Sequence, residues 1–288
     1  MNDTINRSQK NEWDKIITSD KGKIGLKLNR VWEYRDLTML LVKRDFITYY
    51  KQTVFGPLWY LVQPVLTTIM YMIIFGSLAK LGTDDIPQVL FYFSGTMLWT
   101  YFSGNLKEVS NTFTVNKNIF SKVFFPRIVV PIATTIGLLI KLGIQFVLFV
   151  IVYIYFFIRG FRINVSWTIC MFPFLIIWLS LLSCGLGMII SSITTKYKDL
   201  ALILDFIISL WMYATPIVYP ISEVPDSLKI FACLNPVSAP VELFRYCFFG
   251  ISSIPLWVVL VSLIMTMVLF IFGVLVFNRN EKTFVDVI

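Results

Sequence analysis

The chain has 288 residues, of which 57% are hydrophobic and only 15% are charged, with a formal net charge of +8. Its mean hydropathy of +0.75 indicates more apolar surface than a soluble domain of this size can bury. We therefore expect an all-α protein that crosses a membrane several times. The sequence contains no histidine, no Gly-x-x-x-x-Gly-Lys-Ser/Thr phosphate-binding loop and no Cys-x-x-Cys spacing. We therefore expect no catalytic, metal or ATP site on this chain.

Two segments precede the first apolar stretch. Residues 1–29 are polar and basic without apolar periodicity, which predicts a cytoplasmic tail and no cleavable signal peptide. Residues 30–57 predict an amphipathic helix in the headgroup plane, ended by Gly56–Pro57. It is either an anchoring extension of the first span or a lever that transmits motion into it. Its predicted apolar arc consists of Val31, Trp32, Met39, Val42, Phe46, Tyr49 and Tyr50.

The remainder, 58–288, predicts a transmembrane domain of six helices, since a bilayer core needs about 20 apolar residues per helix. The expected spans are 58–79, 86–106, 129–158, 167–193, 201–222 and 255–277. Six crossings place both termini on one side of the membrane.

The second span carries an aromatic stripe at helical spacing, formed by Phe91, Tyr92, Trp99 and Phe102. Such a stripe is either a packing or interfacial surface or a channel wall on which sugar rings stack. Further candidate channel aromatics are Tyr60, Tyr71, Trp211, Tyr213 and Tyr219.

A polar segment at 107–128 follows the second span. Basic side chains alternate there with aromatic ones, and we predict a short amphipathic helix that presents Phe120 to a soluble partner. The alternative is an ordinary surface helix packed under the spans. The short link at 196–199 lies on the same side and could contact the same partner.

Two ionisable residues lie inside predicted spans, Lys141 in the third and Asp205 in the fifth. Charges at this depth need partners, so we expect Lys141 and Asp205 to pair and tie the two spans together. A proton relay is the alternative.

The segment 223–254 contains two apolar pieces that are too short to cross, 228–234 and 241–251, split by Asn235–Pro236. We predict a re-entrant helical hairpin, with a plain amphipathic surface loop as the alternative. Glu242 and Arg245 are three residues apart and could pair on one helix face.

Cys233 and Cys247 lie in the same hairpin segment. They could form a disulfide if this side of the membrane is oxidising.

The positive-inside rule sets the orientation. Nineteen Lys and Arg residues fall on the side of the termini, against five on the other side and Lys141 within a span. Both termini are therefore expected to be cytoplasmic. The basic excess describes topology and lipid contact, and we expect no nucleic-acid partner.

A series of short motifs keeps its order along the chain: Lys43-Arg44-Asp45, Tyr50-Lys51, Phe55-Gly56-Pro57-Leu58-Trp59, Gln63-Pro64, Phe125-Pro126-Arg127, Tyr197-Lys198-Asp199-Leu200, Thr215-Pro216-Ile217-Val218-Tyr219 and Leu234-Asn235-Pro236. In these motifs the chain resembles the permeases of type-two ABC exporters that move polysaccharides. The resemblance runs from about Leu37 to the end of the chain. Lys198 departs from the arginine that is common there, so a bidentate contact at that position would be weaker.

This resemblance implies a bacterial cytoplasmic-membrane permease that exports a lipid-linked polysaccharide such as an O-antigen, a teichoic acid or a capsule chain. It also implies a homodimer with two separate ATPase subunits, which would carry ATP and Mg²⁺. Spans one and five would line the channel. The implied ATPase-coupling residues are Asn116, Lys117, Ile119, Phe120, Ser121, Lys122, Lys196, Tyr197, Lys198 and Asp199. The interface helix would contribute Arg44, Asp45 and Lys51, and the external gate Asn235, Pro236, Glu242 and Arg245.

Two rival functions stay open. One is a permease of the same architecture that exports a drug, lipid or peptide, and it is favoured by an aliphatic channel wall. The other is a membrane-embedded glycosyl or lipid transferase, which would need a pair of acidic residues near the membrane interface. The candidate pair is Asp84–Asp85, which lies outside the predicted spans.

Overall fold

The computed structural model describes residues 32–51, 56–120, 122–123, 125–161, 167–194, 199–251 and 254–287. The predicted tail at 1–29 lies outside them. Throughout these residues the regular structure is helical, as the sequence predicts. The first half of the chain contains α2 (Arg35–Lys51), η1 (Gly56–Leu58), α3 (Trp59–Tyr71), η2 (Met72–Leu78), α4 (Gln88–Ser110), α5 (Thr112–Val115), α6 (Lys117–Phe120) and α7 (Val129–Ile158). The second half contains η3 (Trp167–Met171), α8 (Phe172–Thr194), α9 (Asp199–Tyr213), η4 (Ile221–Glu223), α10 (Asp226–Leu234), α11 (Ser238–Phe249) and α12 (Leu256–Val287).

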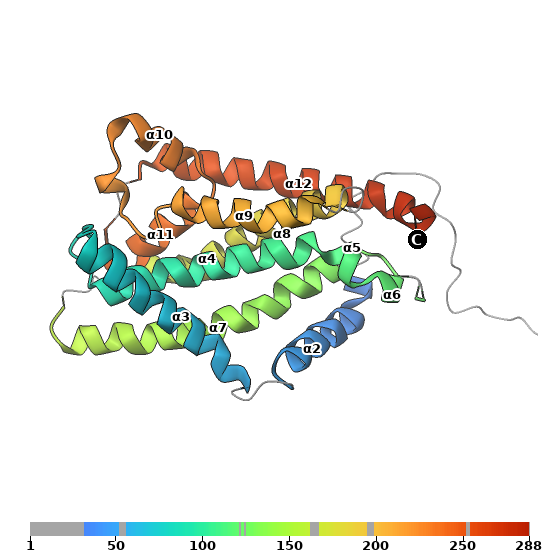
Figure 1. The fold of residues 1–288 in the computed structure, drawn as a ribbon, viewed down its shortest axis with the longest axis horizontal. Coiled ribbons are helices and arrows are strands. Elements are labelled where there is room, and N and C mark those ends of the chain that lie inside the picture. The colour runs from blue at the N-terminus through green and yellow to red at the C-terminus, as the bar shows by residue number, and fades with distance from the viewer. Residues whose placement is uncertain are drawn as a thin grey trace, which may run out of the picture.

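The long helices form an elongated bundle (Figure 1). One end carries α10 and α11 and is called the hairpin end here. The opposite end carries α5 and α6 and is called the α5–α6 end. The α12 helix ends at the α5–α6 end (Figure 1).

Four helices of the described part are long and apolar enough to cross a membrane. They are Trp59–Leu78, Val129–Ile158, Trp167–Thr194 and Leu256–Asn280. Four of the six predicted spans therefore coincide with helices that have the length and hydropathy of a membrane span. The α4 helix has 23 residues, but serine, threonine, tyrosine and asparagine side chains interrupt its apolar surface. The α9 helix has only 15 residues, which at 1.5 Å per residue reach about 22 Å, less than a bilayer core of about 30 Å.

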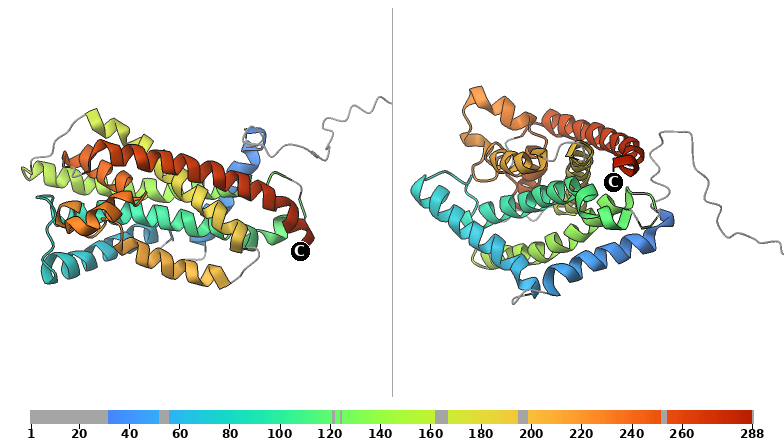
Figure 2. Two further views of the ribbon diagram at one scale, coloured as in Figure 1. Left: turned by 90° about the horizontal axis from the view of Figure 1, so that it is seen from above. Right: turned by 45° about the vertical axis from the view of Figure 1, so that its right-hand side comes forward.

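The α4 helix is the centre of the bundle. It packs against α3, α7, α8, α9 and α11, and α12 packs along α8 on the far side (Figures 1 and 2). Glycines allow that second contact, because a Cβ at Gly185 would lie 2.6 Å from the Cα of Phe270. Small residues permit such close approach between membrane helices.

Buried polar side chains join the helices around α4. The Asn105 amide donates to Ser183 Oγ at 2.7 Å, and Thr135 Oγ1 donates to Asn105 Oδ1 at 3.0 Å. This one residue of α4 therefore binds both α8 and α7. Between α8 and α12, Trp178 Nε1 donates to Thr266 Oγ1 at 2.8 Å. Such bonds between helices stabilise a bundle whose surroundings are as apolar as its core.

The α2 helix packs on α7 at an oblique angle, at the edge of the bundle (Figure 1). Its buried residues are Thr38, Leu41 and Val42, whereas Met39 is 66% exposed. Leu41 and Val42 belong to a buried cluster with residues of α4–α8 and α12, so this face of the helix packs on the bundle. Trp32 and Met39 of the predicted apolar arc are exposed. Val31 and the side chains of Tyr49 and Tyr50 lie outside the described residues.

The first predicted span is made of three helical types in succession. Gly56 has a φ of +52°, a left-handed conformation that glycine adopts without strain, where the predicted break before the span lies. The α3 helix contains Pro64, and the chain continues as a π-helix over Met72–Leu78. A π-helix of this kind is rare and often lies at functional sites.

Candidate functional site

The predicted hairpin is present as α10 and α11, which meet at Asn235–Pro236. The α11 helix is largely buried and packs against α4, α8, η3 and α12, so it re-enters the helix bundle and is no plain surface loop. It ends at Gly250, whose φ is +75°. Cys233 and Cys247 are both free and buried, so the disulfide considered from the sequence is not formed.

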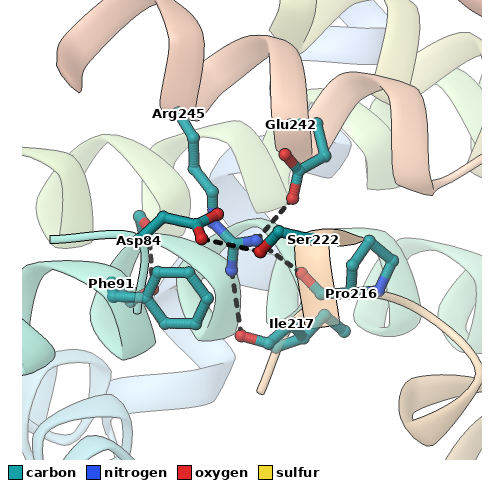
Figure 3. Close-up of polar contacts among 8 residues, drawn as sticks. Asp84, Phe91, Pro216, Ile217, Ser222, Glu242 and Arg245 are labelled. Carbon is teal, nitrogen blue, oxygen red and sulfur yellow. Dashed lines mark hydrogen bonds and ion pairs between the residues drawn. The ribbon is translucent and has the colours of Figure 1, made fainter. Parts of the chain in front are cut away.

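Arg245 is the centre of a buried polar cluster (Figure 3). Its Nη1 lies 2.6 Å from Glu242 Oε1, and the two side chains are only 2% and 4% exposed. The pairing predicted from the spacing is thereby confirmed. The Arg245 guanidinium also donates to the carbonyl oxygens of Pro216, at 2.8 Å, and Ile217, at 3.0 Å. It therefore fixes the turn that follows α9.

The same guanidinium lies over an aromatic ring and beside a glycine of α4. The Arg245 Cζ is 3.8 Å from the centre of the Phe91 ring, a cation–π contact. A Cβ at Gly95 would lie 2.8 Å from the carbonyl oxygen of Ile217 and 3.3 Å from Arg245 Nη2. Only glycine leaves room here for the turn and the guanidinium together.

Asn235, predicted as a gate residue, uses its whole amide to join the hairpin to the end of α9. Its Nδ2 donates to the Ala214 carbonyl at 3.2 Å and to Thr215 Oγ1 at 2.8 Å. Its Oδ1 accepts from Trp211 Nε1 and from the Val237 backbone, each at 3.1 Å.

Pro236 connects the same corner of the hairpin to the last helix. Its carbonyl oxygen accepts from Ser262 Oγ of α12 at 2.8 Å. The predicted gate residues therefore form one polar junction between α9, α11 and α12.

The loop before α4 is held against the hairpin segment by acidic residues that sequence reasoning did not assign to this site. Asp84 has a φ of +49° and accepts from Ser222 Oγ at 2.6 Å (Figure 3). Glu223 Oε1 accepts from the Gly82 backbone at 2.7 Å. Asp84 is therefore engaged in a turn, which argues against the paired acids of a transferase. The run Gly82-Thr83-Asp84-Asp85, whose residue types favour turns, is the sequence signal that could have indicated this loop.

Most of the predicted channel aromatics are buried inside this protomer. Tyr60, Phe91, Tyr92, Trp99 and Phe102 are at most 6% exposed, so the prediction that they line a channel is wrong. The reason is that α4 is surrounded by other helices and its stripe packs into the core.

Three other candidate aromatics lie at or near the surface of α3 and α9. Tyr213 is 54% exposed. The hydroxyl of Tyr219 donates to the Tyr213 carbonyl at 3.0 Å, and that of Tyr71 donates to Met212 Sδ at 3.2 Å. Tyr71 thus joins the first predicted span to the fifth.

At the α5–α6 end the predicted amphipathic helix is two short helices of four residues each. Phe120 is 8% exposed and packs against Phe113 and Phe125, with Arg127 Cζ 5.3 Å from its ring centre. The prediction that Phe120 is presented to a partner is therefore wrong, because its ring completes the cluster under α2.

The exposed side chains beside Phe120 form a small mixed patch. It consists of Val115, Lys117, Lys122 and Val123, of which Val115 is 71% and Val123 55% exposed. We call these four residues the α5–α6 patch. The predicted coupling residue Ile119 is half-buried. Ser121, Lys196, Tyr197 and Lys198 lie outside the described residues, and Asp199 is exposed at the start of α9.

Arg44 of the interface helix connects α2 to Asn116, which lies between Val115 and Lys117 of this patch. Arg44 Nε donates to Asp45 Oδ1 at 2.8 Å, and Arg44 Nη2 donates to Asn116 Oδ1 at 3.4 Å. Asn116 is 7% exposed and caps the junction of α5 and α6. Lys51 is exposed at the end of α2.

The predicted pair of Lys141 and Asp205 is wrong. Asp205 Oδ2 accepts from Lys107 Nζ of α4 at 3.0 Å, and Lys141 Nζ lies 5.5 Å from the ring centre of Tyr60. The physical reason is the order of the helices, since α4 lies between α7 and α9 and supplies the nearer cation (Figures 1 and 2).

A bundle of this kind can be compared with known proteins. The sequence model of the family described as "ABC-2 type transporter" matches residues 36–249, from α2 through the hairpin. The chain belongs to the ABC-2 type transporter family. The match and the four apolar helices confirm the predicted class, a multi-pass permease of the cytoplasmic membrane.

Several curated proteins are similar over most of their length. The "O-antigen export system permease protein RfbA" of Klebsiella pneumoniae is 26% identical over 255 residues, which cover 88% of this chain and 95% of that protein. The protein of the same name from Myxococcus xanthus is 23% identical over 77% of this chain and 84% of its own length. The "Polysialic acid transport protein KpsM" of Escherichia coli is 24% identical over 71% of this chain and 78% of its own.

Proposed function

We propose that this ABC-2 permease is the membrane subunit of an ATP-driven exporter that moves a lipid-linked polysaccharide across the cytoplasmic membrane. The observation that carries the proposal is the similarity, over nearly the whole chain, to permeases named for O-antigen export and polysialic acid transport. The chain itself supplies a helix bundle and a hairpin, and the ATPase chemistry belongs to a separate subunit.

In this proposal the α5–α6 end faces the cytoplasm together with both termini. The distribution of Lys and Arg supports this orientation. The bundle then crosses six times, and the two further crossings are α4, which is less apolar, and α9, which is shorter. Both helices run along the bundle axis beside the four apolar ones, which supports this role (Figure 1).

Two copies of an ATP-binding cassette ATPase would dock on a permease homodimer at the α5–α6 patch. A small surface of valines flanked by lysines suits a modest protein interface. The hydrogen bond from Arg44 to Asn116 would transmit displacement of the patch to α2. ATP and Mg²⁺ would be bound by the partner.

The export path would open between α3 and α9. Few side chains of these helices are buried within the protomer: Tyr60, Pro64 and Thr68 in α3, and Leu204 and Ile208 in α9. The junction at Asn235 and Arg245 would then act as the gate at the outer end. The aromatic contacts to sugar would come from Tyr71 and Tyr213, since the aromatic residues of α4 are buried.

A permease of the same architecture for a drug, lipid or peptide is the second candidate. The exposed faces of α3 and α9 are mainly aliphatic, with Ile69 at 47%, Ile203 at 49% and Leu210 at 53% exposure, which favours an apolar cargo. The Escherichia coli K12 protein named "Inner membrane transport permease YadH", 25% identical over 68% of this chain, carries no substrate in its name.

ATP hydrolysis by the purified complex tests the proposal. The chain would be co-purified with its ATPase subunit in lipid nanodiscs, and lipid-linked glycans, phospholipids and hydrophobic peptides would be added separately. We expect stimulation by a lipid-linked glycan alone. Stimulation by the apolar compounds alone would favour the second candidate.

A further inference from the structure

A cleft of about 580 Å³ opens at the hairpin end between α9, α10 and the loop before α4. Its walls include Leu81, Trp211, Tyr213, Leu228 and Phe231. None of the contacts described above for Arg245 lies in this cleft, so it is separate from the buried ion pair.

The polar atoms of the walls are mostly satisfied within the protein. All four hydrogen-bonding positions of the Asn235 amide are occupied, including one by Trp211 Nε1. The Tyr219 hydroxyl donates to the Tyr213 carbonyl. The cleft therefore offers ring faces and aliphatic groups, and few free donors or acceptors for the hydroxyl groups of a sugar.

The surface around the cleft is also apolar. Leu228, Phe231 and Leu234 of α10 are 56%, 68% and 47% exposed. In a membrane permease such side chains face lipid or another apolar partner. The cleft is thus continuous with the surface that the bilayer would cover.

We propose that this cleft binds the hydrocarbon chain of a membrane lipid, from the leaflet at the hairpin end. The described residues that line the cleft include no Lys or Arg that could bind a phosphate head group. Their one charged side chain is the Glu223 carboxylate, which accepts a hydrogen bond from the Gly82 backbone. The chain of the lipid would enter and the head group would stay outside. This inference rests on the membrane location and not on which substrate is transported.

Photo-crosslinking in nanodiscs tests it. The full chain would be reconstituted with a phospholipid that carries a diazirine in its acyl chain, or with a photoreactive isoprenoid phosphate, and adducts would be mapped by mass spectrometry. We expect adducts on Trp211, Leu228 and Phe231. Ala214→Trp, directly after α9, should fill the cleft and reduce these adducts several-fold, whereas Leu202→Trp, on an 80% exposed site of α9, should not.

The two probes distinguish which kind of lipid supplies the bound hydrocarbon chain. Labelling by the phospholipid alone supports a structural lipid, and labelling that unlabelled isoprenoid phosphate displaces supports an isoprenoid lipid. Equal labelling in Ala214→Trp and Leu202→Trp would overturn the proposal, because it indicates bulk lipid. An absence of adducts together with crosslinking between two copies through Ala214→Cys would also overturn it. Leu228→Gln, on a 56% exposed residue, provides a second variant if Ala214→Trp does not fold.

Discussion

Lys107 and Asp205 join α4 to α9 at the α5–α6 end, with 3.0 Å between Nζ and Oδ2. Their side chains are 51% and 55% exposed, whereas the Glu242–Arg245 pair near the other end of α9 is 2% to 4% exposed. Exposed pairs contribute little stability, but breaking a buried pair is costly. The α9 helix is therefore attached weakly at the α5–α6 end and firmly at the hairpin end. This difference would allow the helix to pivot about its hairpin end.

Removal of the exposed pair should leave the fold intact. Lys107→Ala and Asp205→Ala should each change stability little, and a double-mutant cycle should give a coupling of about 0.2–1 kcal/mol. The measurement is thermal unfolding in detergent at low and high salt. A coupling that salt does not reduce would contradict the assignment of this pair as an exposed, releasable contact.

Removal of Glu242 should be far more damaging. Glu242→Ala leaves the Arg245 guanidinium buried without its anion, a loss of about 3–5 kcal/mol. Glu242→Gln keeps one acceptor and should recover part of that loss. Thermal unfolding of the two variants beside Asp226→Ala, an exposed acidic residue of α10, provides the comparison. Equal melting temperatures for Glu242→Ala and the control would show that the ion pair does not hold the hairpin.

Gly95 should tolerate no side chain. Gly95→Ala places a Cβ 2.8 Å from the Ile217 carbonyl and should cost about 1–3 kcal/mol through overpacking. Gly104→Ala, in the same helix, meets nothing within 4 Å and should be neutral or stabilising. Proteolysis of the hairpin segment should accelerate in the first variant only. If both variants behave alike, the turn after α9 is not seated on Gly95.

Substitutions of a buried and of an exposed residue at the α5–α6 end should affect stability and ATPase docking separately. Phe120→Ala removes a buried ring and should cost about 3–5 kcal/mol. Lys122→Glu alters an exposed side chain, so it should leave the melting temperature unchanged and reduce the amount of ATPase that co-purifies. The matched control is Lys229→Glu on α10. The docking assignment fails if Lys122→Glu retains the full amount of ATPase.

Local spacing predicted much of this structure. The third predicted span matches α7 residue for residue, because its 30 predominantly apolar residues form one uninterrupted helix. The ion pair of Glu242 and Arg245 follows from their separation by three residues. Asn235–Pro236 marks the break between α10 and α11, since proline disfavours helix continuation.

Contacts between distant helices were not predictable in the same way. Which cation reaches Asp205 depends on α4 lying beside α9, and periodicity carries no information about helix order. Phe120 and Phe91 appear as exposed aromatics in a linear pattern, yet α2 and the hairpin cover them.

The most direct test of the central claim is translocation in proteoliposomes that contain the chain and its ATPase subunit. A lipid-linked polysaccharide would be placed on the ATP side, and its arrival on the other side would be read by its accessibility to a glycan-specific lectin. We predict ATP-dependent arrival of the glycan, abolished by Glu242→Ala. Failure of every lipid-linked glycan to cross, with ATP-dependent transfer of a phospholipid or drug in the same vesicles, would contradict the account.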